Sequence, residues 1–258
     1  MNIEKDLSYL IRCLEPRAQI PSDPLQLWRL YRSLVNVRMP GEMPPDYMEV
    51  ENRLLQEVNQ RKGIVGLHDL IEAEPKIYLW QGDITTLRID AIVNAANSQM
   101  LGCFCPCHGC IDNAIHTFAG VELRNECAKI MRRQGHLEAT GSAKITPGYN
   151  LPAKHVIHTV GPIIGDAVCD KDRQALRGCY TSSMELAEQY GLTAIAFCCI
   201  STGEFRFPNE LAAQIAVETV RDYLRHSDLK VVFNVFKDLD RQIYEKLLGQ
   251  PREEAYSK

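Results

Sequence analysis

The chain has 258 residues, of which 45% are hydrophobic and 24% are charged, as is ordinary for a soluble globular protein. The net charge of −4 provides no broad basic field, so nucleic acid is not an expected partner. No apolar run is long enough to span a bilayer, and the N-terminus lacks the basic start and apolar core of a signal peptide. We therefore expect a cytoplasmic protein that associates with no membrane.

Residues 1–75 are predicted to form a helical N-terminal extension. One helix is expected to begin at Ser22-Asp-Pro24, where Asp caps the helix and Pro occupies its first turn. Another is expected to begin at Pro44-Pro-Asp46, and residues 3–14 show a weaker amphipathic pattern. The character changes after residue 75, so we divide the chain into this extension and a second domain over 76–258.

Strands and helices are predicted to alternate in the second domain, which favours a sheet with helices on both faces. The expected strands are 77–80, 91–94, 143–146, 155–160, 194–200 and 229–233. The expected helices are 112–133, 174–190, 209–225 and 239–248.

Ten cysteines need an explanation in a chain without an export signal, where reduced thiols or metal ligands are more plausible than disulfides. Only Cys103, Cys105, Cys107 and Cys110 form a cluster, with His108 among them. They follow a predicted strand, where α/β proteins place binding groups, and they are the donors that a tetrahedral metal site requires. The density of donors favours a bound metal over free thiols.

Two metal arrangements remain open from the residues alone. Cys103, His108 and Cys110 could hold zinc and leave a fourth position open, as catalytic zinc sites do. Alternatively, four protein ligands could close the site and make it structural. Asp112 opens the helix that follows, where it is either an ordinary first-turn carboxylate or a functional group.

Further polar groups stand at the ends of other predicted strands. Asp83 could accept a hydrogen bond from an amino group or a ribose hydroxyl, although a capped turn explains it equally. Asn97 suits a hydroxyl-rich ligand, with a strand-end turn as the simpler alternative. The small residues of Ser201-Thr202-Gly203-Glu204 could aim backbone N–H groups at a phosphate, and Phe205 could stack on a sugar.

Taken in order, these segments resemble a macrodomain over roughly residues 75–250. The segments that carry the resemblance are Gly82-Asp83-Ile84-Thr85, Asp90-Ala-Ile-Val-Asn-Ala-Ala-Asn97-Ser, Gly109-Cys-Ile-Asp112-Asn-Ala-Ile-His116, His158-Thr-Val-Gly-Pro162 and Ser201-Thr-Gly-Glu-Phe205. The resemblance implies a three-layer α/β/α fold with a mixed central sheet. It also implies binding of ADP-ribose, which many macrodomains hydrolyse from proteins.

The cysteine cluster stands where most hydrolytic macrodomains carry a glycine-rich loop. This difference, together with the helical extension, resembles the zinc-dependent microbial branch that is linked to sirtuin-type ADP-ribosyltransferases. In that branch, residues at the positions of Cys103, His108 and Cys110 hold Zn2+ facing the distal ribose. Cys105 and Cys107 are extra relative to the pattern, and Arg206 is another departure from it.

The resemblance also implies roles for the remaining candidate residues. Asp83, with Ile84 beside it, would bind the adenine end, and the loop from Ser201 to Phe205, formed by Ser201, Thr202, Gly203, Glu204 and Phe205, would bind the phosphates. Asn97 would hold the distal ribose, and Asn97 and Asp112 would be the catalytic residues next to the zinc.

The function that the resemblance implies is zinc-dependent removal of ADP-ribose from mono-ADP-ribosylated protein. A lipoylated carrier protein modified by a sirtuin-type transferase is the implied substrate. Two alternatives stay open: a non-catalytic ADP-ribose reader, and a hydrolase of small ADP-ribose derivatives. The extension either caps the sheet or docks the modified protein.

Overall fold

The computed structural model describes residues 2–249, so the end of the predicted domain at residue 258 lies outside the described residues. Its centre is a seven-stranded sheet. The strand order is β2 (Glu72–Glu74), β3 (Ile77–Gln81), β9 (Lys230–Val235), β8 (Ala194–Phe197), β5 (Ala91–Ala96), β7 (His155–Val160) and β6 (Ala143–Pro147). The strands from β3 to β7 are parallel, whereas β2 and β6 pair antiparallel at the edges. The prediction of a mixed sheet is therefore confirmed.

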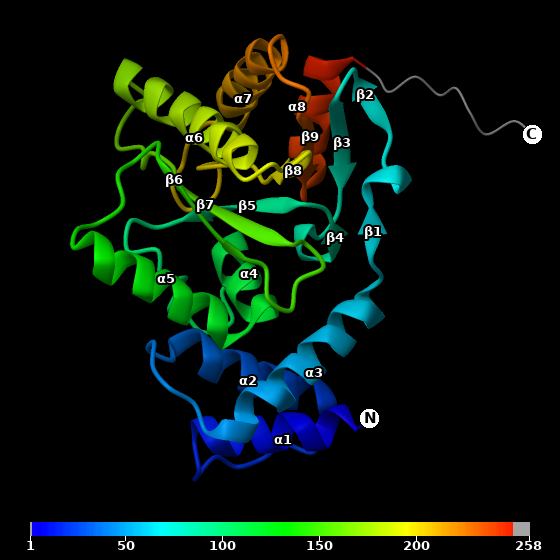
Figure 1. The fold of residues 1–258 in the computed structure, drawn as a ribbon, viewed down its shortest axis with the longest axis vertical. Helices are drawn as coiled ribbons and strands as arrows, with labels where there is room; N and C mark the ends of the chain where they lie inside the picture. The colour runs from blue at the N-terminus through cyan, green and yellow to red at the C-terminus, as the bar shows by residue number, and fades with distance from the viewer. Residues whose placement is uncertain (1, 250–258) are drawn as a thin grey trace, which may run out of the picture.

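Helices cover both faces of this sheet (Figure 1). Helices α6 (Asp170–Gln189), α7 (Asn209–Leu224) and α8 (Asp238–Leu248) lie on one side. Helices α4 (Ile111–Ala119) and α5 (Val121–Gln134) lie on the other. The three-layer α/β/α architecture is thus also confirmed, and it buries the parallel strands on both faces as such sheets require.

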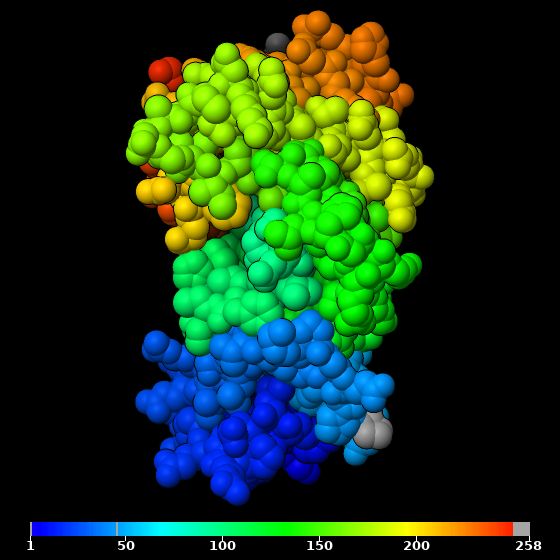
Figure 2. All heavy atoms as spheres, turned by 90° about the vertical axis from the view of Figure 1, so that its left-hand side faces the viewer, coloured from blue at the N-terminus to red at the C-terminus, as the bar shows by residue number. Residues whose placement is uncertain are grey.

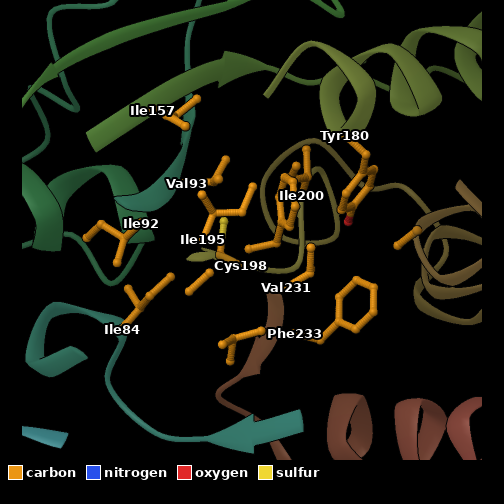
Figure 3. Packing of buried hydrophobic residues seen from close by; sticks show 14 of the residues in the cluster. Ile84, Ile92, Val93, Ile157, Tyr180, Ile195, Cys198, Ile200, Val231 and Phe233 are labelled. Carbon is orange, nitrogen blue, oxygen red and sulfur yellow. The ribbon is translucent and has the colours of Figure 1, made fainter. Parts of the chain in front are cut away.

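The core lies between the sheet and its helices (Figure 3). Val93, Ile195 and Val231 come from the adjacent strands β5, β8 and β9, and all three are fully buried. Tyr180 of α6 packs on Phe197 of β8 with 4.7 Å between the ring centroids. These contacts explain why β5, β8 and β9 are almost continuous apolar runs without the alternation of a half-exposed strand.

The predicted helix 112–133 is wrong in one respect, because the chain forms two helices that meet at Gly120. Gly120 has φ +93°, in the left-handed region that favours glycine. A Cβ atom there would lie 2.8 Å from Oε2 of Glu51. The break between the two helices is therefore required by packing against Glu51. It cannot be seen in the sequence, because the helical periodicity continues on both sides of Gly120.

Helices α1 (Ile3–Leu14), α2 (Pro24–Val37) and α3 (Pro45–Lys62) form the extension, at one end of the molecule (Figures 1 and 2). The predicted start of α2 is confirmed, since Asp23 accepts a hydrogen bond from the Gln26 amide at 2.8 Å. The extension has a core of its own, which also includes Val121 of α5. The buried residues of this core are Leu7, Leu10, Ile11, Leu27, Tyr31, Val35, Tyr47, Leu54, Leu55 and Val121.

Two short strands lie in the stretch that is predicted to be helical. β1 (Val65–Gly66) pairs in parallel with β4 (Leu87–Arg88), and β2 joins the edge of the main sheet. The sheet therefore begins before residue 76. Pairing with a neighbouring strand decides these segments, because they are too short to show a period of their own. Among residues 2–249, no helix is long and apolar enough to cross a membrane.

Candidate active site

A cavity of about 910 Å³ opens where the parallel strands β3, β9, β8 and β5 end. Gly82 and Asp83 follow β3, Asn97 follows β5, and the loop 198–205 follows β8. The first turn of α4 and the loop before it form another wall. Ligands of open α/β sheets bind outside the carboxyl ends of the strands, so the position of the cavity is that of a ligand site.

All predicted site residues line this single cavity. They are Asp83, Ile84, Asn97, Cys103, His108, Cys110, Asp112, Ser201, Thr202, Gly203, Glu204 and Phe205. The structure therefore brings together residues that are up to 122 positions apart, computed as 205 − 83. Their individual roles remain predictions, whereas their convergence is a property of the fold.

Three potential metal ligands converge on one point beside the cavity. The ligand atoms of Cys103, His108 and Cys110 all lie within 4.8 Å of one another. The distance from Sγ of Cys103 to Nδ1 of His108 is 3.7 Å, close to the ~3.5 Å that separates two ligands of a tetrahedral zinc ion. The thiols and the imidazole also match the donor preference of zinc.

The other two cysteines of the loop point elsewhere. Cys105 is exposed, and the thiol of Cys107 donates to the carbonyl of Arg29 at 3.4 Å. Neither joins the ligand cluster formed by the described residues. The geometry thus brings three potential ligands together and leaves the other two thiols of the loop outside the cluster.

Asp112 lies in the first turn of α4, beside this cluster, and its side chain is almost completely buried. Its Oδ1 accepts a hydrogen bond from Nδ2 of Asn94 at 2.8 Å and lies 3.5 Å from Nε2 of His116. Burial raises the pKa of Asp112 to about 6, although the bond from Asn94 favours the charged form. Its carboxyl group can accept a hydrogen bond from a sugar hydroxyl or a water in the cavity.

Asn97 is engaged within the loop that it opens. Its Nδ2 donates to the carbonyl of Gly102 at 3.1 Å, and its Oδ1 accepts from the amide of Gln99 at 3.0 Å. The side chain therefore closes a strand-end turn and also lines the cavity, and its role toward a ligand stays a prediction.

The loop after β8 contains the residues predicted to bind phosphate, and it lines the cavity. Ser201 adopts φ +65°, and its buried Oγ has no hydrogen-bond partner among the described residues. Gly161 makes room for it, because a Cβ atom at Gly161 would lie 2.0 Å from that Oγ. Arg206 donates to the carbonyl of Ile164 at 3.1 Å and does not line the cavity. It braces the neighbouring loop and offers no phosphate contact in this conformation.

Asp83 at the opposite end of the cavity is held in place by hydrogen bonds. Its Oδ1 accepts from the amide and the hydroxyl of Thr85 at 3.0 and 2.6 Å. Lys62 of α3 forms an ion pair with it. Burial acts to raise the pKa of Asp83, but Lys62 and Thr85 outweigh it and hold the pKa below the ordinary value. Asp83 is therefore an ionised acceptor at neutral pH.

Several lining residues escape sequence reasoning. Arg32 belongs to the extension, and Lys62 contacts the cavity residue Asp83 from the same extension, but nothing in their local sequence indicates this. Phe236 follows β9, lines the cavity and is 74% exposed. The sequence could have identified Phe236, since an aromatic residue just beyond a buried strand is a candidate for stacking on a base or a sugar.

Comparisons with known proteins agree with this fold. The family model for the Macro domain matches residues 93–216. A protein of Treponema medium called protein-ADP-ribose hydrolase is 53% identical over 237 residues, which cover 90% of this chain and 91% of that protein. A protein of Staphylococcus aureus (strain MSSA476) with the same name is 52% identical, and the match covers 91% and 89% of the two chains.

Among solved structures, the Trypanosoma brucei macrodomain in complex with ADP-ribose superposes with a TM-score of 0.66. It is 31% identical in sequence, and the match covers 89% of this chain and 97% of that one. The chain therefore belongs to the macro domain family. Within that family, two relatives that share about half of their residues with this chain are called protein-ADP-ribose hydrolase.

Proposed function

We propose that this protein is a zinc-dependent hydrolase that removes ADP-ribose from mono-ADP-ribosylated protein. The observation that carries the proposal is the arrangement of the cavity. One pocket of about 910 Å³ is lined both by the residues predicted to bind the nucleotide, from Asp83 to Phe205, and by the cluster of three potential zinc ligands. The names of the relatives at 53% and 52% identity support the hydrolase activity. The zinc dependence rests on the donor set alone.

Different residues of the cavity would bind different parts of ADP-ribose. Ionised Asp83 suits the amino group of adenine as an acceptor, with Ile84 beside it. The loop from Ser201 to Phe205 lines the cavity, and its backbone N–H groups would bind the phosphates. Asn97 and Asp112 lie on the metal side, where the distal ribose would be bound.

Cys103, His108 and Cys110 would hold the zinc. When bound, zinc supplies Lewis-acid chemistry, which stabilises negative charge on an oxygen or lowers the pKa of a water. Asp112 would accept a proton or a hydrogen bond from a ribose hydroxyl or a water. Its bond from Asn94 holds the carboxyl group in one orientation for this task.

For the protein substrate, we propose a lipoylated carrier protein modified by a sirtuin-type transferase. This part rests only on the resemblance of the cysteine loop and the helical extension to the sirtuin-linked branch. Turnover of an ADP-ribosylated lipoyl carrier, measured beside another mono-ADP-ribosylated protein, tests it. Equal turnover of both would contradict the assignment of the carrier and leave the hydrolase proposal intact.

The decisive experiment measures turnover of an ADP-ribosylated protein and the metal content of the same sample. We expect near-stoichiometric zinc, with activity that is lost on chelation and restored by added zinc. Cys110→Ala should lower turnover by about 100-fold or more while ADP-ribose still binds, because only charge stabilisation in the transition state is lost. Cys105→Ala is the matched control, since this exposed thiol lies outside the ligand cluster and its loss should leave turnover unchanged.

Three results would contradict parts of the proposal. Zinc without turnover on any linkage would identify a reader, in which the metal only shapes the loop. Turnover of small ADP-ribose derivatives without turnover of modified protein would identify the third candidate function. Turnover by a protein that contains no metal would contradict the zinc assignment and leave Asp112 as the central catalytic group.

A further inference from the structure

The extension contacts the metal loop directly through Arg32 of α2. One guanidinium nitrogen, Nη2, donates to the carbonyl of His108 and to Oδ1 of Asn113, both at 2.7 Å. These contacts join residues that are 76 and 81 positions apart in the chain. Of the three candidate ligands, His108 is therefore fixed at its backbone by a residue from another part of the molecule.

Asn113 extends this connection to the rest of the loop. The side chain is fully buried, and its Nδ2 donates to the carbonyls of Cys105 at 3.0 Å and Cys103 at 3.5 Å. Its backbone N–H donates to Sγ of Cys110 at 3.4 Å. Arg32 and Asn113 together thus touch the backbone or the ligand atom of all three candidate ligands.

Arg32 also determines how the amide of Asn113 is oriented. A guanidinium group is only a donor, so the oxygen of the Asn113 amide must face it. The amide nitrogen must then face the loop, where it meets two carbonyls. Without Arg32 the amide oxygen would lose its donor, and the buried Asn113 side chain would be held only from the side of the loop. The arginine therefore holds a buried polar network in the one orientation that satisfies it.

From these contacts we infer that Arg32 and Asn113 are positioning residues that preorganise the zinc ligands, so that helix α2 sets the affinity for the metal. The inference rests on the proposed zinc site and deepens it. The loop from Gly102 to Cys110 has no regular secondary structure, and its ligands would otherwise sample many positions. Partners outside the ligand set that hold ligands in place typically contribute about 10- to 100-fold to metal affinity.

The test measures zinc affinity in the full chain by competition with a chromophoric chelator. Arg32→Met keeps an unbranched apolar stem and removes the donors of the side chain, and we expect zinc to bind about 10- to 100-fold more weakly. Arg32→Lys keeps the charge and one donor and should fall between Arg32→Met and the wild type. Cobalt provides a second readout, because its d–d and thiolate charge-transfer bands should weaken or shift when the tetrahedral ligand set is distorted.

Arg38→Met is the matched control. Arg38 caps the same helix, but its guanidinium bonds only the carbonyls of residues 39, 41 and 42. This variant should bind zinc like the wild type. Zinc binding by Arg32→Met at wild-type affinity would overturn the inference. Equal weakening in Arg32→Met and Arg38→Met would also overturn it, since general loosening of α2 would then be the cause.

Two further outcomes complete the design. If Arg32→Met does not fold, Arg32→Lys decides, and wild-type zinc affinity in that variant overturns the inference. If the wild type itself takes up neither zinc nor cobalt, the proposed zinc site is wrong and the inference falls with it. Weak zinc binding in the Arg32 variants beside a tight wild type supports both.

Discussion

At the scale of single residues, the surroundings of a side chain decide what its chemistry can be used for. Four cysteines lie within eight positions, but only Cys103 and Cys110 converge with His108. Cys107 is turned away by its contact with the carbonyl of Arg29. Asp83 and Asp112 are both carboxylates, yet Lys62 holds the pKa of the first below its ordinary value, whereas burial raises the pKa of the second to about 6. In the proposed function, the surroundings of Asp83 suit the adenine of ADP-ribose and those of Asp112 suit its distal ribose.

Phe236 gives a prediction at this scale. It is exposed at the rim of the cavity near Asp83, where an adenine ring could stack on it. Phe236→Ala should weaken ADP-ribose binding by about 1–3 kcal/mol, roughly 5- to 150-fold, without changing the melting temperature. Isothermal titration calorimetry with ADP-ribose measures the effect. Leu239→Ala is the control, because this exposed residue lies outside the cavity lining. Unchanged affinity in Phe236→Ala would rule out stacking at this position.

At the scale of elements, Glu51 connects the extension to the helices that carry the site. This fully buried residue of α3 accepts hydrogen bonds from the hydroxyls of Tyr31 and Tyr47 at 2.8 and 2.9 Å. It also accepts from the amide of Val121 at 2.9 Å, at the start of α5. A carboxylate is favourable there because the free N–H groups of a helix start carry partial positive charge. The break at Gly120 gives this carboxylate access to the start of α5.

We therefore expect Glu51→Ala to lower the free energy of unfolding by about 3 kcal/mol or more, since it leaves three buried donors without an acceptor. Glu51→Gln should cost less, because its amide oxygen can still accept from Val121 while the amide nitrogen donates to a tyrosine hydroxyl. Urea unfolding followed by circular dichroism measures both variants. Equal losses in the two variants would show that packing volume, and not hydrogen bonding, makes Glu51 important.

At the scale of the whole molecule, the extension and the α/β/α layers form one folded unit. They share a core that contains Val121, and Arg124 of α5 donates to the carbonyls of Val35 and Arg38 in the extension. The same Arg124 donates to the carbonyl of Leu101, next to the metal loop. Of the two interpretations left open for the extension, these contacts favour the structural cap, and they add a bracing role for the site.

Deleting residues 1–62 should consequently yield an insoluble or unfolded protein, because it exposes the shared core and removes two of the three carbonyls that accept hydrogen bonds from Arg124. Soluble expression and the circular dichroism spectrum of the remaining chain provide the measurement. A soluble, folded product that turns over small substrates and has lost only the modified protein would contradict this expectation. That result would support the docking interpretation of the extension.

The sequence by itself determined the positions of most strands and helices and part of the set of residues that line the cavity. It could do so because each buried element carries its own periodicity, and because carboxyl ends of parallel strands meet at one edge of the sheet. The ordered motifs around Asp83, Asn97, Asp112 and Ser201 then pointed to a single ligand.

Only the tertiary structure decided the break at Gly120, the choice among the clustered cysteines and the contacts of Arg32 and Lys62 with the site. These features share one physical reason. Each depends on the approach of groups that are far apart in the chain, such as Arg32 and Asn113, which are 81 residues apart. Such an approach leaves no local period or motif, because it is set by how the layers pack and not by how each element forms.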